Sequence, residues 1–372
     1  MLSPQVSRSV STLFLSLSLV LCLSPLAHAQ ALYASKTAKT SATDAALFVP
    51  MSKFEASLKT LELSGLTTKS PDYQALTKLY RDMLSASNKH DIAGIIKHYS
   101  PQFISGDNLK LAELKSLITE TWGSYPGIQY DSQLQSIHLT GDWASIDTHD
   151  YSYADIKAQP NDEVVGNLPG TLNSESNNQL FFKRVGDSWV VVGDATTWEK
   201  AEVRYGIARG LPMELSTPEQ VKAGELYSTS LDVKPPQNGF AIVAIANQEL
   251  TFPHVPTDDK FRPMNSSNKA VQRVLRANSS NRNEIVTATI GLPSVSESQS
   301  DRPSIGLEGI ATIVKRVNVI PISKEEVIKA MALETIVRTS ANGKVNLEKV
   351  DEQYNKQVPS LFTPSQPGST GE

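Results

Sequence analysis

The best candidates for chemistry in this chain lie in one predicted β-strand, Ser145 to Tyr153. Side chains alternate across a strand, so four of them share one face: Asp147, His149, Tyr151 and Tyr153. In a cavity, a carboxylate, an imidazole and phenols favour acid–base chemistry, because burial raises the pKa of a carboxyl and changes that of an imidazole. A second interpretation stays open. In that interpretation this face points to solvent or across a dimer contact, and the smaller, more apolar residues between these positions pack in the core.

Three further side chains are candidates to line a ligand pocket. Tyr99 ends a predicted short helix, Trp122 ends another, and Asp194 lies in a predicted strand. Aromatic rings there would give a ligand shape and apolar contact area, although each position fits plain core or strand-end surface equally well. The catalytic candidates are therefore Asp147, His149 and Tyr151, and the ligand-pocket candidates are Tyr99, Trp122, Tyr153 and Asp194.

Several classes of protein are excluded by what the sequence lacks. It has no phosphate-binding loop, dinucleotide fingerprint, metalloprotease helix or nucleophile elbow. The histidines form no close pair at metal-ligand spacing, so we expect neither a metal nor a cofactor. The net charge of −4 over 372 residues gives no basic field that would recruit nucleic acid.

The first 29 residues have the pattern of an export signal. Arg8 precedes an apolar run, Val10 to Leu23, which is shorter than the ~20 residues that a membrane-spanning helix needs. Small residues follow at Ala27 and Ala29, so we expect cleavage between Ala29 and Gln30. The only cysteine leaves with the signal, and an exported chain without disulfides is typical of a bacterial envelope. We therefore expect a periplasmic or extracellular protein, with no transmembrane segment after cleavage.

Periodicity divides the next part into helices and then strands. Apolar residues at helical spacing predict helices over about 71–84, 91–99 and 109–122. The period then changes to two, which predicts strands over 127–139, 143–153, 180–184 and 189–197. The polar residues 155–178 are expected to form a long loop or hairpin tip.

Three segments of this part resemble the nuclear-transport-factor-2-like superfamily. They are Lys89 to Pro101, the turn Gly141-Asp142-Trp143-Ala144, and Phe181 to Val192. The resemblance covers about residues 70–200, a third of the chain. It implies a cone in which helices pack on a bent antiparallel sheet and leave a pocket. Some members, the SnoaL-like cyclases and ketosteroid isomerases, use pocket carboxylates and tyrosines, and others only bind or assemble. No position here aligns with their catalytic acid or base.

The second half predicts a different architecture. Residues 199–216 are expected to form a connector with a short helix near 201–208. Strands are predicted near 227–233, 240–246, 284–292 and 306–320, which suggests a small β-sandwich. A basic cluster lies between them, and Arg273 and Arg276 would share a face if that segment were helical. The cluster either contacts an anionic envelope component or lies in a solvated loop.

The sequence thus predicts an α+β protein: a cone-shaped, helices-on-curved-antiparallel-sheet domain, then a β-sandwich-like domain and C-terminal helices. The expected segments are a signal peptide (1–29), a flexible lead-in with a short helix (30–69), the cone (70–205), the sandwich (215–322), helices (323–358) and a disordered tail (359–372). We expect a non-catalytic protein of the bacterial envelope that binds a small lipophilic ligand or an envelope component, with a homodimer as an option. The alternative is a SnoaL-like or isomerase-like enzyme doing acid–base chemistry on a small lipophilic substrate.

Overall fold

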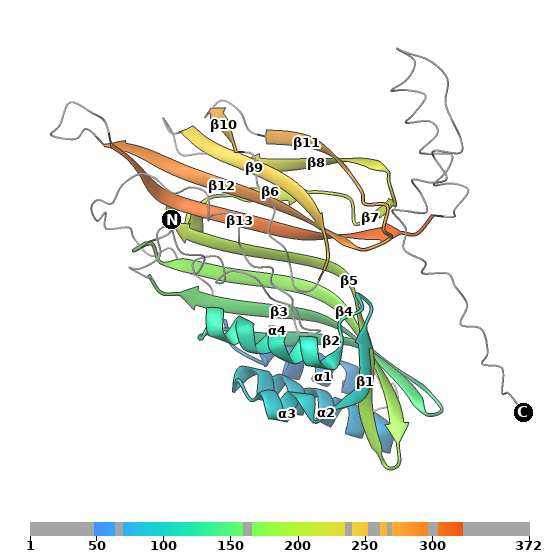
Figure 1. Cartoon of the computed structure of the whole chain (residues 1–372). Helices are drawn as coiled ribbons and strands as arrows, with labels where there is room; N and C mark the ends of the chain where they lie inside the picture. Colours follow the sequence, from blue (N-terminus) through green and yellow to red (C-terminus); the bar gives the residue numbers. More distant parts are fainter. Residues whose placement is uncertain are drawn as a thin grey trace, which may run out of the picture.

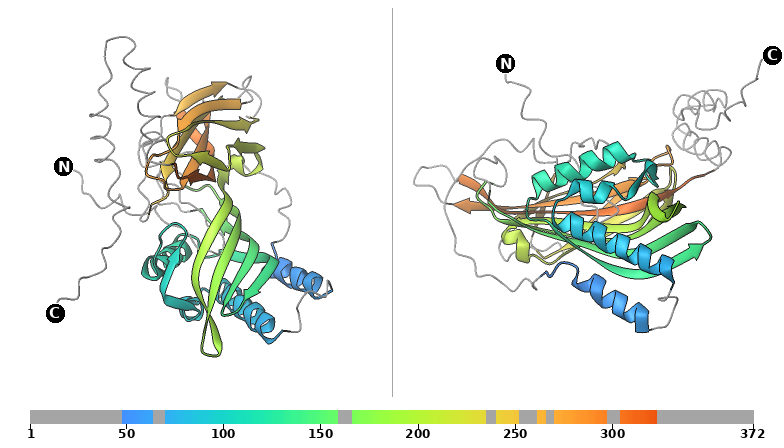
Figure 2. Two further views of the ribbon diagram at one scale, coloured as in Figure 1. Left: turned by 90° about the vertical axis from the view of Figure 1, so that its right-hand side faces the viewer. Right: turned by 90° about the horizontal axis from the view of Figure 1, so that it is seen from below.

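A computed structural model describes residues 48–63, 70–158, 166–234, 240–251, 261–265, 270–296 and 304–322. In these residues a few helices gather on one side of a large, strongly bent sheet (Figures 1 and 2). The predicted signal peptide, the C-terminal helices and the tail lie outside the described residues. No helix within the described ranges is long and apolar enough to cross a membrane.

Four helices cover the first half of the sheet: α1 (Ser52–Leu63), α2 (Pro71–Asn88), α3 (Ile92–Ile96) and α4 (Leu111–Ser124). The α2 helix begins where proline stands at the first helical position, as expected. The Asp91 side chain caps α3 by accepting a hydrogen bond of 2.9 Å from the Gly94 backbone nitrogen. The apolar stripes of these helices pack together with one face of the sheet in a single core.

Five strands belong to the first half: β1 (Tyr99–Ser105), β2 (Gln129–Thr140), β3 (Trp143–Ile156), β4 (Gly170–Val185) and β5 (Ser188–Gly206). Strands β2 to β5 pair antiparallel in chain order, and β1 adds in parallel to β5. The hairpin turns contain Gly141 and Gly186, whose φ angles of 60° and 59° suit glycine. Helices on a bent antiparallel sheet are the architecture that the sequence predicts.

The strand boundaries differ from prediction at two places. The polar segment that we expected as a loop becomes strand from Gly170 onward, because its Ser and Asn side chains hydrogen-bond inside the fold. The expected connector and helix after Thr197 are also wrong. Strand β5 continues to Gly206, with Ala201 and Val203 buried on the helix side of the sheet.

The extension of β5 joins the two halves into one sheet. Strand β13 (Ser304–Ile320) pairs antiparallel with residues 200–206 of β5. The sheet then continues through β12 (Glu284–Ser296), β9 (Phe240–Glu249) and β10 (Arg262–Asn265). The halves that the sequence predicts as separate domains therefore share hydrogen-bonded strands.

A second, three-stranded sheet packs on the opposite face of this extension. It consists of β11 (Ala270–Arg276), β8 (Leu226–Val233) and β6 (Met213–Ser216). The short helix η3 (Ile207–Gly210) leads from β5 to β6. The short strand β7 (Gln220–Lys222) pairs with β13. The two layers enclose a second apolar core. Because β11 is a strand, Arg273 and Arg276 point to opposite faces, and the condition under which they would share a face, a helix, is not met.

Candidate functional site

A row of polar residues crosses the helix-covered face of the sheet. Asp150 of β3 lies opposite Ser176 of β4, and Ser176 lies opposite Glu199 of β5. Directly paired residues point to the same face, which here also carries the apolar residues of the first core. Asp150, Ser176 and Glu199 are 0%, 0% and 3% exposed. We call these three residues the interior row.

Asp150, at one end of the interior row, has its hydrogen bonds supplied by the chain itself. Its carboxylate accepts from Tyr80 Oη at 3.1 Å, Ser132 Oγ at 2.5 Å and Asn178 Nδ2 at 2.7 Å. Burial raises the pKa of this carboxyl, while the three donors lower it in part. The pKa of the Tyr80 phenol is raised well above its usual value by burial and by the nearby Asp150. Asp150 therefore fastens α2 and β2 to the sheet.

Replacing Tyr80 by phenylalanine tests that structural role. The change removes one donor from a fully buried carboxyl, so we expect a loss of about 1–3 kcal/mol in the free energy of unfolding. Urea denaturation measures it. Tyr153→Phe is the matched control, because the Tyr153 hydroxyl donates only to the exposed Asp155, at 2.6 Å. Equal effects of the two substitutions would contradict the assignment.

Glu199 lies at the other end of the interior row and, unlike Asp150, has no hydrogen bonds supplied to its carboxyl by the described residues. Neither of its carboxyl oxygens has a hydrogen-bond partner among the described residues. Burial raises the pKa of this carboxyl well above its usual value; the positive charge of Arg316 opposes that shift and the negative charge of Asp107 adds to it. Glu199 is therefore a buried hydrogen-bonding group that has no partner among the described residues.

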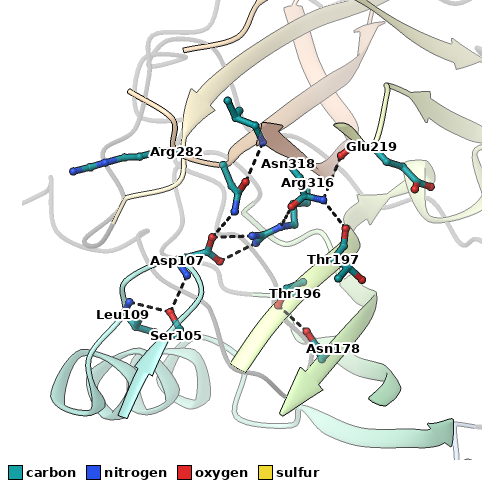
Figure 3. A network of polar contacts seen from close by, with 12 residues as sticks. Ser105, Asp107, Leu109, Asn178, Thr196, Thr197, Glu219, Arg282, Arg316 and Asn318 are labelled. Carbon is teal, nitrogen blue, oxygen red and sulfur yellow. Dashed lines mark hydrogen bonds and ion pairs between the residues drawn. The ribbon is translucent and has the colours of Figure 1, made fainter. Parts of the chain in front are cut away.

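The charge of Arg316 acts on Glu199, but the Arg316 side chain is already engaged by other groups (Figure 3). It follows Lys315, the last residue of β13 that pairs with β5. Its guanidinium donates to both oxygens of Asp107, at 2.7 and 2.9 Å, and its Nε donates to Asn318 Oδ1 at 2.7 Å. The Arg316 side chain is 2% exposed. The positive charge of Arg316 is thus paired with Asp107, and its guanidinium N–H groups donate to Asp107 and Asn318.

Asp107 reaches this position from the turn between β1 and α4 (Figure 3). The Ser105 hydroxyl fixes the turn by accepting from the backbone nitrogens of Asp107 and Leu109. Asn283, next to β12, donates to Asp107 Oδ1 at 2.8 Å. The two halves of the chain are therefore connected by a buried ion pair as well as by the shared sheet.

The strand residues predicted for catalysis lie on the other face of β3. There Asp147 accepts from Gln179 Nε2 at 2.7 Å and from the Ser136 hydroxyl. His149 Nδ1 lies 2.5 Å from Asn177 Oδ1. Tyr151 lies under the Lys53 ammonium, 3.9 Å from it. The structure thus groups the predicted residues, including Tyr153, on one face, but that face is separated by the sheet from the interior row.

The other pocket candidates lie in or near the first core. Tyr99 is buried and meets Phe103 edge-on at 4.9 Å. Trp122 is half-buried, donates to Tyr130 Oη at 3.2 Å and stacks on His90. Asp194 is 8% exposed, and its backbone carbonyl accepts from the Gly106 nitrogen at 2.7 Å.

The structure brings none of these candidates into hydrogen-bond contact with the interior row, which the sequence analysis missed. One signal for Asp150 was in the sequence, since it stands in the same strand as Asp147 with the opposite parity. In the part of the chain that the structure describes, no three His, Asp or Glu side chains come close enough to hold a metal ion.

Comparisons with known proteins concern the first half of the fold. No protein-family model matches the chain, and no curated protein matches it either. Solved structures do match, over about a third of the chain, and they include proteins described as nuclear-transport-factor-2-like (NTF2-like) and cystatin-like. This is the superfamily that residues 70–200 resemble.

Three of these structures illustrate the range. An NTF2-like protein of unknown function from Pseudomonas putida is 16% identical; the match covers 32% of this chain and 82% of that one, with a TM-score of 0.23. A cystatin-like-fold protein of unknown function from Nostoc punctiforme is 10% identical, with 34% and 91% covered and a TM-score of 0.27. Bd1075 of Bdellovibrio bacteriovorus is 13% identical, with 33% of this chain and only 39% of that chain covered and a TM-score of 0.27. These similarities concern the fold and not the activity.

Proposed function

We propose that this is an exported, non-catalytic binding protein of the bacterial cell envelope that takes a small lipophilic ligand with one polar group. The observation that carries the proposal is Glu199. A buried carboxyl without a partner costs about 1–3 kcal/mol of stability. A ligand hydroxyl, carbonyl or amine next to it would remove that cost, and the surrounding apolar core suits the rest of a lipophilic molecule.

The arrangement favours binding over catalysis. Asp150 is held by three donors of the chain itself, so it is not available to move a proton of a substrate. Asp147 and His149 lie across the sheet from Glu199 and cannot act on the same molecule. Export is supported by the pattern of the first 29 residues.

The second candidate function is an acid–base enzyme on a small lipophilic substrate. The raised pKa of Glu199 favours it, because a buried carboxyl that holds its proton more tightly than usual can serve as a general acid. In this function Glu199 would donate a proton to the substrate, and a base on the same face of the sheet would also be needed.

A thermal-shift screen tests binding. The mature chain is heated with small lipophilic alcohols, ketones and amines. A ligand at 100 times its dissociation constant stabilises the folded state by about 2.7 kcal/mol, which raises the melting temperature. We expect Glu199→Leu to abolish this rise and Asp147→Asn to leave it unchanged. A hit whose shift survives Glu199→Leu would contradict the proposed site.

Turnover separates the two candidate functions. Each hit is incubated with the protein and followed by mass spectrometry and by exchange of carbon-bound hydrogen for deuterium. Unchanged ligand supports the binding protein. Conversion or exchange that is lost in Glu199→Gln, with binding retained, would support the enzyme instead.

A further inference from the structure

The outer face of the sheet carries an ordered group of rings that the proposed function does not use. His149 of β3, Asn177 of β4 and Trp198 of β5 are direct neighbours in register, so their side chains form a line across three strands. Tyr151 stands two residues from His149 on the same face. We call His149, Tyr151, Asn177 and Trp198 the ring patch.

Nothing in the described part of the chain packs over the centre of the ring patch. The three-stranded sheet covers the same face of the extension, but no residue of that second core comes from β3 or β4. Among the described residues only Lys53, in the first turn of α1, reaches one side of the patch, where its ammonium lies over Tyr151. The side chains of Tyr151 and Trp198 are half-buried, and that of His149 is 19% exposed.

The rings are held in place by contacts within the patch. His149 and Trp198 are nearly parallel, with an angle of 22° and centroids 6.0 Å apart, and His149 meets Tyr151 edge-on at 4.6 Å. The bond between His149 Nδ1 and Asn177 Oδ1 fixes the imidazole. Side chains that are fixed before binding lose little conformational freedom when a ligand arrives.

The polar groups around the rings favour an uncharged ligand. Asp147 is engaged by Gln179 and Ser136 and lies 3.5 Å from His138, and Glu175 lies 3.6 Å from His149. Two lysines also lie on this side, Lys53 over the Tyr151 ring and Lys200 opposite Glu175 in register, so the face carries charges of both signs as well as amides. Amide and carboxylate groups next to aromatic faces suit a molecule that has both hydroxyl edges and C–H faces, which is the surface of a sugar ring.

We propose that the ring patch is a binding site for a neutral oligosaccharide. Sugar C–H faces stack on Trp198 and His149, and sugar hydroxyls bond to Asn177 and to the carboxylates beside it. This site lies across the sheet from Glu199, so it is separate from the proposed lipophilic site and does not depend on it.

Isothermal titration with chitotetraose and with cellotetraose tests the proposal. We expect one of the two to bind, with perturbation of the Trp198 indole signal in NMR spectra. Trp198→Ala should weaken binding about tenfold, since ring stacking is worth about 0.5–1.5 kcal/mol beyond contact area and 1.4 kcal/mol corresponds to tenfold. The matched control is Trp143→Ala, because Trp143 lies on the same face, outside the patch, and is 51% exposed. Glu199→Leu should also leave sugar binding intact.

Three results would overturn the proposal. One is the absence of binding by either sugar at millimolar concentration. Another is an equal loss in Trp143→Ala and Trp198→Ala. The third is a dimer in light scattering that Trp198→Ala converts to a monomer, which would assign the face to a second copy of this chain. A failed thermal-shift screen with lipophilic ligands would leave the sugar result standing, and the reverse holds as well.

Discussion

Replacing Glu199 by leucine is expected to stabilise the protein at neutral pH. Both carboxyl oxygens of Glu199 are buried without a partner in the described part of the chain, so the native state bears a cost of about 1–3 kcal/mol that an apolar side chain of similar size removes. Most core substitutions destabilise proteins, which makes this direction diagnostic. Urea denaturation of the parent and of Glu199→Leu at pH 7 measures the difference. A loss of stability in the variant would show that Glu199 has a favourable partner.

The same residue makes stability depend on pH in a definite direction. The pKa of Glu199 is raised in the folded state above its usual value, so the folded protein holds this proton more tightly than the unfolded chain does. The contribution of Glu199 to stability is therefore fully present below the unfolded pKa, which for glutamate is about 4.3, and is lost as pH rises toward the folded pKa. Glu199→Gln, which cannot titrate, should flatten this fall in stability with rising pH. An unchanged slope in Glu199→Gln would contradict the shift.

The order of helices and strands could be predicted because it follows from local patterns. Hydrophobic residues at helical spacing, Pro71 and the hairpin glycines act over a few residues and are visible in the sequence. These patterns also identify Tyr227, Leu231 and Val233 as the buried side of β8. The sequence also shows that its two halves differ in their patterns of secondary structure, but it does not show that both halves share one sheet.

The site could not be predicted, because its face of β3 is unusual. The middle of the buried side consists of the polar residues Thr148, Asp150 and Ser152, so it is no more hydrophobic there than the opposite side with His149 and Tyr151. Which side is buried depends on partners far away in the sequence, such as Tyr80, which supplies a donor to Asp150. Pairing of this kind is a tertiary property that no local period records.

Glu199 was hidden for a related reason. Strand β5 has irregularities in its pairing with β4, one of them at Thr197, and a bulge shifts the alternation of buried and exposed positions. Beyond Thr197 the sequence is rich in charged residues, which favoured a connector over a strand. Only the long-range pairing with β13 shows that Glu199 is enclosed.

Replacing Arg316 by methionine is expected to give the largest loss of stability among the substitutions considered. The change leaves the Asp107 carboxylate without its partner, and breaking a buried ion pair from one side costs about 3–5 kcal/mol. The matched control is Lys78→Met. It breaks the exposed pair of Lys78 with Asp82, which should change stability by about 0–0.5 kcal/mol. Urea denaturation of both variants measures the contrast, and similar small losses would contradict a structural role for the junction.

The Asp107→Asn variant shows how the two neighbouring carboxyls are coupled. Without the Asp107 charge, Arg316 has one other acid beside it, Glu199, so the pKa of Glu199 should fall and its carboxylate should replace Asp107 in part. Asp107→Asn should therefore cost more stability in a Glu199→Gln background, where this replacement is not possible. A double-mutant cycle measures the coupling, and additivity within about 0.5 kcal/mol would show that Arg316 does not turn to Glu199. If the coupling is found, Glu199 has a second role beside the proposed ligand contact, as a reserve partner for the arginine that connects the two halves of the sheet.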